Sequence, residues 1–182
     1  RSVRFRLPAS MNQVEYFGRG PAENYLDRNA GSMVGLYKST AEELYFPYVR
    51  PQENGHHTDT RWVSLSTGKK GLLIQADNTI GFNALRNSIE DFDDEEATGL
   101  SRQWSNFTPE QVANHDEAAA KNVLRRQHHI NDITPRDFVE VCVDLKQQGV
   151  AGYDSWGSRP EPAYTLPANR EYNWGFTLIP LK

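Results

Sequence analysis

Alternating apolar and polar positions predict a series of short β-strands along this chain. The clearest lies at residues 139–145, where Val139, Val141, Val143 and Leu145 alternate with Glu140, Cys142 and Asp144. Weaker alternation predicts further strands at 2–7, 13–17, 33–40, 60–65, 79–85 and 172–179, and a continuous apolar run predicts another at 71–75. Turn residues separate most of these segments, which is typical of antiparallel β-structure.

Only one stretch has a helical start signal. Thr108-Pro109-Glu110-Gln111 offers an N-cap, a proline at the first helical position and a glutamine two residues later. We therefore expect one short helical segment within residues 109–126. Together with eight to ten strands, it predicts an all-β fold, a large antiparallel β-sandwich, forming one domain over residues 1–182.

The composition of the chain does not suggest a nucleic-acid or membrane partner. The chain has 182 residues, of which 37% are hydrophobic and 24% charged, and its net charge is −4, so no basic excess points to nucleic acid. No apolar run approaches the length of a membrane span. The one cysteine, Cys142, excludes an internal disulfide. The chain starts on strand-like residues without a methionine, so we expect a fragment with an open sheet edge; its compartment, cytoplasmic or periplasmic, stays undecided.

A glycine-rich loop follows the clearest strand. Residues 149–159 contain three glycines and place Trp156 beside Asp154 and Ser155. An indole face can stack on the apolar face of a sugar while short polar side chains bind its hydroxyls. On composition alone, the favoured interpretation is that Trp156 fills the edge of the core under the loop, and a sugar-contacting loop is the alternative.

Three motifs resemble the last domain, called the small-chain domain, of bacterial β-galactosidases of glycoside hydrolase family 2. The loop sequence Gly-Val-Ala-Gly-Tyr-Asp-Ser-Trp-Gly at 149–157 is similar to that family's Gly-Gly-Asp-Asp/Asn-Ser-Trp-Gly motif. Residues 17–28 resemble its Gly-x-Gly-Pro-x-Glu-Asn-Tyr-x-Asp-Arg motif, and residues 47–55 its Pro-Tyr-x-x-Pro-Gln-Glu-x-Gly motif. Ala151 and Tyr153 depart from the pattern, standing where Gly and Asp are usual.

The resemblance implies an accessory domain that lends residues to an active site completed elsewhere. It implies a sandwich of the galactose-mutarotase-like type, incomplete at its N-terminus, in a β-galactosidase that hydrolyses terminal β-D-galactosides. The family's catalytic glutamates lie in a preceding barrel domain, so no catalytic residue is expected here, and Trp156, Asp154 and Ser155 are the expected substrate-binding residues. His129 matches a histidine of the family. The expected partners are a β-galactoside sugar and the remaining domains of the same enzyme. The complete enzyme is expected to be a homo-oligomer. The family commonly uses Mg and Na, but no cofactor is expected to bind this chain.

Other functions remain open from the residues alone. Retaining hydrolysis needs two carboxylates about 5 Å apart, and the carboxylates on turns do not single out a pair: Glu23, Asp27, Glu53, Asp59 and Asp154. A free-standing carbohydrate-binding module would bind sugar through Trp156 unaided. An aldose mutarotase would need a histidine acid and a glutamate base, for which His56, His57, His129 and Glu53 supply the residue types. A purely structural domain is the fourth possibility.

Two polar clusters suggest metal binding but are better explained otherwise. His56 and His57 are adjacent, and neighbouring side chains in a strand point to opposite faces, so we expect an ordered, metal-free turn here. Residues 90–96 hold six acidic side chains in seven but lack the glycine and spacing of a calcium loop, so we expect a solvated face.

Overall fold

The computed structural model describes residues 2–92, 130–154 and 157–182. These residues confirm the all-β class. They form one open antiparallel sheet of seven strands, with almost no helix among them. The strands are β1 (Ser2–Pro8), β2 (Gln13–Gly20), β3 (Met33–Thr40), β4 (His57–Ser66), β5 (Gly71–Leu85), β6 (Phe138–Asp144) and β7 (Phe176–Leu181).

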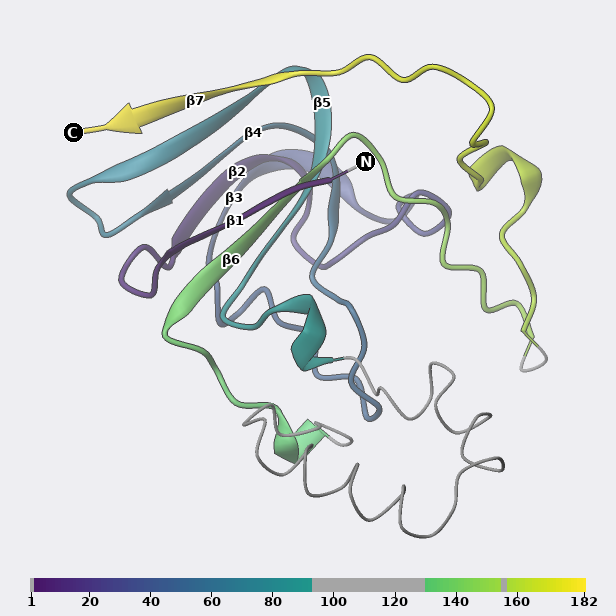
Figure 1. Ribbon diagram of the computed structural model, residues 1–182, viewed down its shortest axis with the longest axis horizontal. Helices are drawn as coiled ribbons and strands as arrows, with labels where there is room; N and C mark the ends of the chain where they lie inside the picture. Colours follow the sequence, from purple (N-terminus) through teal and green to yellow (C-terminus); the bar gives the residue numbers. More distant parts are fainter. Residues whose placement is uncertain (1, 93–129, 155–156) are drawn as a thin grey trace, which may run out of the picture. The chain divides into compact units, whose positions relative to one another are not determined.

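The sheet order is β1-β6-β5-β4-β2-β3, and β7 also pairs with β5. β5 is 15 residues long and pairs with two strands, β6 and β7, along the edge opposite β4, as Figure 1 shows. Its first half pairs with β7 from Gly71 to Ala76, and its second half pairs with β6 from Gly81 to Leu85. β1 lies at one edge of the sheet, where the strand-like start of the chain predicts an open edge.

One face of the sheet forms the core. Val139, Val141 and Val143 of β6 are fully buried there, beside Phe82 and Ala84 of β5. Val14 and Tyr16 of β2 and Val63 and Leu65 of β4 continue the same apolar face. The strict period of two in β6 therefore placed its apolar side chains correctly.

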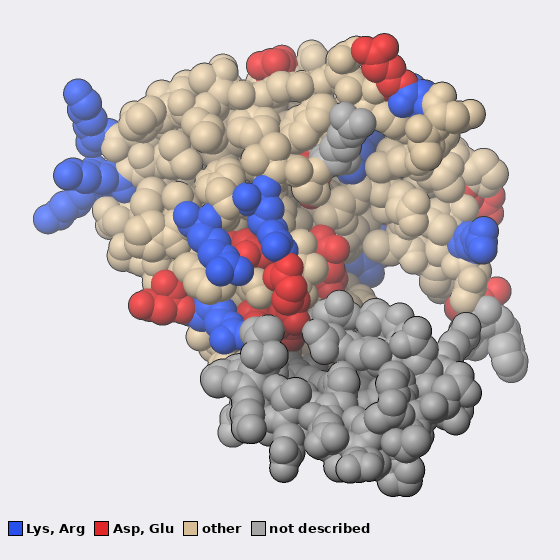
Figure 2. All heavy atoms as spheres, viewed as in Figure 1, with Lys and Arg blue, Asp and Glu red and all other residues tan. Residues whose placement is uncertain are grey.

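The other face is more polar near β1 and β6. Arg4 and Arg6 form ion pairs with Glu140, at 3.6 and 2.9 Å, although Glu140 itself is buried. Figure 2 shows basic and acidic side chains side by side over these two strands. The Ser2 hydroxyl donates to Asp144, which is also buried.

The largest departures from the predicted strands are in β5 and β7. The segments 71–75 and 79–85 belong to one strand, because pairing with β4 continues past the polar residues Asp77 and Asn78. The last strand begins at Phe176 and not at residue 172. Before it, aromatic side chains pack on one another and on arginine, Trp174 on Phe176 and Arg170 over Tyr172, so the apolar alternation there reflects packing without strand pairing.

The chain divides into two compact units. The sheet belongs to the first, residues 1–46, 54–87 and 135–182, which also contains the short 3₁₀ helix η5 (Pro162–Tyr164). The second comprises residues 47–53 and 88–134 and contains the 3₁₀ helices η1 (Ile89–Asp91) and η4 (Ile130–Asp132). The helix expected within 109–126 lies outside the described residues.

The acidic stretch at 90–96 is not uniformly solvated. Asp91 is buried. Its carboxylate accepts a 2.9 Å bond from the Ser88 N–H and so caps η1, which offsets the cost of burying it. Glu90 is exposed as expected, and residues 93–96 lie outside the described part of the chain.

No helix in the described ranges is both long and apolar enough to span a membrane.

Candidate functional site

The first and third motifs and the last two residues of the second, Asn54 and Gly55, meet at one end of the sheet, around the loop before β3, the start of β4 and the loop after β6. We call this region the motif junction and define it as residues 22–28, 54–59 and 146–151. All of its residues belong to the first unit. Its contacts join segments that are up to 124 residues apart in the sequence.

Asn24 links the first motif to β4. It is fully buried, and its Nδ2 donates to the carbonyl oxygens of Arg19 and Ala22 at 3.0 and 3.1 Å. Its Oδ1 accepts from both the N–H and the hydroxyl of Thr58, at 2.9 and 2.5 Å, and its own N–H donates to the His56 carbonyl at 2.7 Å. The asparagine side chain thus satisfies four groups, two carbonyl oxygens and the N–H and hydroxyl of Thr58, and the Asn24 backbone satisfies a fifth.

Glu23 joins the first motif to the second. One of its carboxylate oxygens accepts from the Gly55 N–H at 2.7 Å, and the other accepts from Arg28 at 2.7 Å. The Arg28 guanidinium also lies over the Tyr25 ring, 5.2 Å from its centre. The Glu23 side chain is only 4% exposed, and these contacts offset the free-energy cost of burying its charge.

The two adjacent histidines have separate surroundings, as expected from their opposite directions. The His56 ring stacks on Tyr25, and its Nδ1 lies 2.9 Å from Asn83 Oδ1. Asn83 Nδ2 donates to the Asn54 carbonyl, so its Oδ1 is free to accept the proton of His56 Nδ1. A Cβ on Gly81 would fall 2.4 Å from this imidazole, so the glycine makes room for the ring.

His57 is packed between aromatic rings. It stacks on Phe82 and meets Tyr16 edge-on, with ring centres 5.1 and 4.9 Å away. Its ring nitrogens lie 2.9 and 3.2 Å from the carbonyl oxygens of Gly55 and Pro21. Burial lowers the pKa of His57, and the two carbonyl oxygens oppose this shift. The polar side chains of this turn therefore bond to the backbone and to each other, as predicted.

Metal binding finds no support in this part of the molecule. Within the described ranges, no three side chains of His, Cys, Asp or Glu are grouped so that they could hold one ion.

Asp59 has a backbone φ of +51°, in the left-handed region that non-glycine residues seldom adopt. It lies where the register between β4 and β5 shifts. Its carboxylate accepts a 2.6 Å bond from Arg19, whose guanidinium also donates to the carbonyls of Asn29 and Ser32. Asp59 therefore fixes the loop before β3.

Asp27 connects the first motif to the glycine-rich loop after β6. Its two carboxylate oxygens accept from the backbone N–H groups of Val150 and Ala151, at 3.0 and 2.8 Å. Gly149 allows this approach, since a Cβ there would fall 2.5 Å from the Asp27 carboxylate. The Gly149 N–H donates to the Tyr164 carbonyl at 2.8 Å, which holds the loop from its other side. We call this set of contacts the Asp27 clamp.

The loop continues as a tight polar turn. Asp154 accepts a 3.3 Å bond from the Ser158 N–H, and the Ser158 hydroxyl accepts one of 3.2 Å from the Tyr153 N–H. Of the three expected sugar-binding residues, Asp154 thus has a role in closing this turn. Ser155 and Trp156 follow Asp154 in the sequence and, like His129, are outside the described residues.

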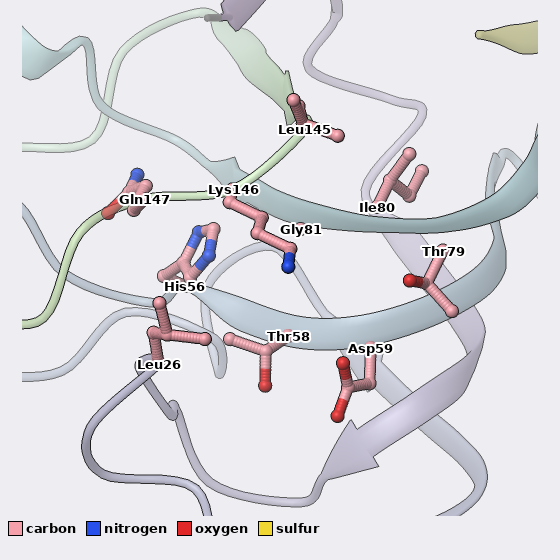
Figure 3. A pocket seen from close by; sticks show the side chains of 10 residues that line it. All are labelled: Leu26, His56, Thr58, Asp59, Thr79, Ile80, Gly81, Leu145, Lys146 and Gln147. Carbon is pink, nitrogen blue, oxygen red and sulfur yellow. The ribbon is translucent and has the colours of Figure 1, made fainter. Parts of the chain in front are cut away.

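A small pocket opens beside the clamp. Figure 3 shows His56, Asp59 and Leu26 around it, with Lys146 reaching across from the loop after β6. Its volume of about 60 Å³ is far below the roughly 300–1,000 Å³ of pockets that enclose small molecules. The pocket alone therefore cannot enclose a sugar ring.

Comparison with known proteins agrees with the three motifs. The family model described as beta galactosidase small chain matches residues 2–178. The chain belongs to the beta galactosidase small chain family. Its relatives include the β-galactosidases of Priestia megaterium, 34% identical over 97% of this chain, and of Vibrio cholerae, 29% identical over 94% of it. These matches cover only 14% and 13% of the two relatives, so this chain spans about one-seventh of their length.

Sequence reasoning found the segments of the motif junction but not the hydrogen bonds within it. Glu23 and Asp27 were considered as candidate catalytic carboxylates, yet both bind backbone N–H groups here. Asn24 was not singled out at all, although its side chain makes four hydrogen bonds, two of them to Thr58 of β4. The one signal in the sequence that these segments contact one another was that Glu-Asn-Tyr-x-Asp-Arg and the glycine-rich loop occur together in the resembled family.

Proposed function

We propose that this chain is the C-terminal accessory domain of a family 2 β-galactosidase that hydrolyses terminal β-D-galactosides. In this proposal the chain lends its glycine-rich loop to the sugar site, and the catalytic glutamates lie in a barrel domain of the same enzyme. Membership of the small-chain family supports the proposal, as do the names of the relatives, all of which are several times longer than this chain.

The state of the carboxylates supports a non-catalytic role for this domain. Glu23 is neutralised by Arg28 and Asp59 by Arg19, and Asp27 is held by two backbone N–H groups. A glycosidase nucleophile and its acid partner must instead face the substrate across a shared site. The observed bonds are those of residues that hold loops in place.

The observation that carries the sugar-site proposal is the Asp27 clamp. A loop that contributes an aromatic wall must keep its position without sugar, because ordering it on binding would cost affinity. The clamp fixes the base of the loop five residues before Trp156. Trp156 would then stack on the apolar face of the galactoside, with Asp154 and Ser155 beside it.

The geometry does not favour the mutarotase alternative. His56 and His57 are each 1% exposed, and both rings contact protein oxygens, so neither is presented to a sugar as an acid. A free-standing carbohydrate-binding module would differ from the proposal in binding galactose without the other domains. Titration of the isolated chain with galactose separates these two functions.

Replacing Trp156 in the longer β-galactosidase tests the proposed function. Covering one indole face with sugar removes on the order of 100 Å² of apolar surface from water, or about 2.5 kcal/mol at about 25 cal/mol per Å². Trp156→Ala should therefore weaken substrate binding roughly 10- to 60-fold, read as KM for nitrophenyl β-galactoside. The melting temperature should hardly change. If Trp156→Ala leaves KM unchanged but strongly lowers the melting temperature, Trp156 fills the core instead.

A further inference from the structure

We propose that the small pocket beside the motif junction binds the hydroxymethyl group of a neutral sugar or polyol. All of the residues that line the pocket belong to the first unit, and they come from the loop before β3, the start of β4, the middle of β5 and the segment just after β6. This assignment goes beyond the proposed function, because it depends neither on the glycine-rich loop nor on the glutamates of another domain.

Three polar side chains face the pocket from different sides. In Figure 3 the Lys146 ammonium and the Asp59 carboxylate lie on opposite sides of the open space, and the Thr79 hydroxyl points between them. Asp59 binds Arg19 through Oδ2, which leaves its Oδ1 available as an acceptor. Within the part of the chain that the structure describes, the Lys146 ammonium and the Thr79 hydroxyl have no hydrogen bond or ion pair. Two opposite charges that face each other without contact leave room for a group that bonds to both.

The hydrogen-bonding groups of the pocket match a hydroxyl. A hydroxyl has one proton to donate and two lone pairs that accept. It can donate to the Asp59 carboxylate and accept from Lys146 and Thr79, so that each of the three side chains gains a partner. A carboxylate ligand would have no proton for Asp59, and an ammonium ligand would be repelled by Lys146. The pocket therefore favours a neutral ligand that both donates and accepts.

The rest of the lining suits the carbon atom that carries the hydroxyl. Leu26, Ile80 and Leu145 give the pocket an apolar side. Contact with these side chains favours a CH₂ group over water. A cavity needs roughly 10–15 Å³ to hold one water molecule. At about 60 Å³, the pocket therefore admits the two heavy atoms of a hydroxymethyl group, while the sugar ring stays outside.

The walls of the pocket are held in place without a ligand. Asp59 keeps its left-handed φ of +51° beside the 2.6 Å bond from Arg19. The buried His56 ring, which also lines the pocket, stacks on Tyr25. Gly81 leaves room for that ring, since a Cβ there would fall 2.4 Å from it. A pocket that is already formed loses little free energy in ordering itself when a ligand enters.

Titration of the 182-residue chain with small neutral ligands tests the assignment. Glycerol and glucose each carry a hydroxymethyl group, and 6-deoxyglucose carries a methyl group in its place. Glycerol and glucose should shift the NMR amide signals of Gly81 and Gln147, with a dissociation constant on the order of 10 mM because so few atoms are bound. 6-Deoxyglucose should bind roughly fivefold more weakly, because it lacks the hydroxyl that bonds to Lys146 and Asp59. Binding of glycerol alone would identify a polyol as the ligand, and binding of glucose alone a sugar.

Charged ligands provide the opposite test. Acetate and ammonium should not displace glucose, because the pocket presents charges of both signs. The assignment is overturned if neither glycerol nor glucose shifts these signals or if 6-deoxyglucose binds as well as glucose. It is also overturned if acetate or ammonium binds more tightly than glycerol.

Two substitutions connect the binding to this pocket. Lys146→Met keeps the apolar stem but removes the charged donor, and it should weaken glucose binding roughly tenfold. Asp59→Asn should weaken binding less, because asparagine tolerates the left-handed φ and its amide oxygen still accepts. The control is Lys70→Met, at an exposed lysine in the turn between β4 and β5, which should leave binding unchanged. Equal binding by Lys146→Met and Lys70→Met would overturn the assignment.

The pocket can also be distinguished from a binding module built on Trp156. Sugar bound by such a module would be lost in Trp156→Ala and kept in Lys146→Met, and the pocket predicts the reverse. Failure of the pocket to bind would leave the proposed function standing, because that proposal does not use Lys146 or Thr79.

Discussion

Ala151 shows most directly how a single residue departs from its motif. The resembled family has glycine at this position, and the observed φ of +58° is one that glycine adopts without strain. An L-residue with a Cβ loses about 1–2 kcal/mol in this conformation. The departure therefore leaves the backbone of the loop in place and stores strain in it.

Replacing Ala151 by glycine should therefore stabilise the protein. Relief of the strain is partly offset by the greater freedom of glycine in the unfolded chain, so we expect a gain of about 0.5–1 kcal/mol in the free energy of unfolding. Ala163→Gly, in the 3₁₀ helix η5 and without a positive φ, is the matched control and should lose about 0.5–1 kcal/mol. Urea denaturation of both variants measures the difference; two losses of equal size would show that Ala151 is not strained.

At the scale of elements, period-two alternation predicted the strands well where one face is buried. It located β6 to within one residue, because Val139, Val141 and Val143 all face the core. It failed at residues 172–175, since aromatic side chains that pack on arginine or on each other alternate in the same way without pairing. It could not reveal the Asp27 clamp, because nothing local in either segment indicates a partner 123 residues away.

The packing of β2, β4 and β5 around His57 should make stability depend on pH. Burial among Tyr16 and Phe82 lowers the pKa of His57 below its usual value, while the neighbouring His56 lowers it further and Glu23 raises it. The unfolded chain then binds more protons than the folded one below about pH 6.5, so stability should fall as the pH falls through this range. The slope from this residue is at most about 1.4 kcal/mol per pH unit.

Comparison with His57→Leu isolates this contribution. The free energy of unfolding should be measured for both proteins at three pH values between 5.5 and 7.5. The variant is less stable at the highest pH, because it loses the bonds to Gly55 and Pro21, but its stability should decline less as the pH falls. Parallel curves would show that His57 does not titrate differently in the two states.

At the scale of the whole molecule, the carboxylates of this chain form a supporting framework. Glu23, Asp27 and Asp59 each fix a different loop around one end of the sheet. Such an arrangement supports loops, and none of these three carboxylates is presented as the acid or the nucleophile of a glycosidase. In the proposed function, the sugar site is completed by other parts of a β-galactosidase.

The isolated chain should accordingly be inactive. We expect no turnover of nitrophenyl β-galactoside by the purified domain, because none of these three carboxylates is presented for catalysis. The assay should include the same protein with Asp27, Glu23 or Asp59 changed to alanine. Turnover by the unaltered domain that disappears in one of these variants would contradict the accessory role.

The Asp27 clamp also has a consequence for the order of folding. Contacts between residues far apart in sequence close large loops, and their entropic cost delays them relative to local hairpins. The hairpin of β2 and β3 can form as soon as its residues are synthesised. The bond between Asp27 and Val150 can form only after more than a hundred further residues have been synthesised. During synthesis, the anchor therefore exists long before the segment it holds, and the glycine-rich loop takes its final position only when nearly the whole domain has left the ribosome.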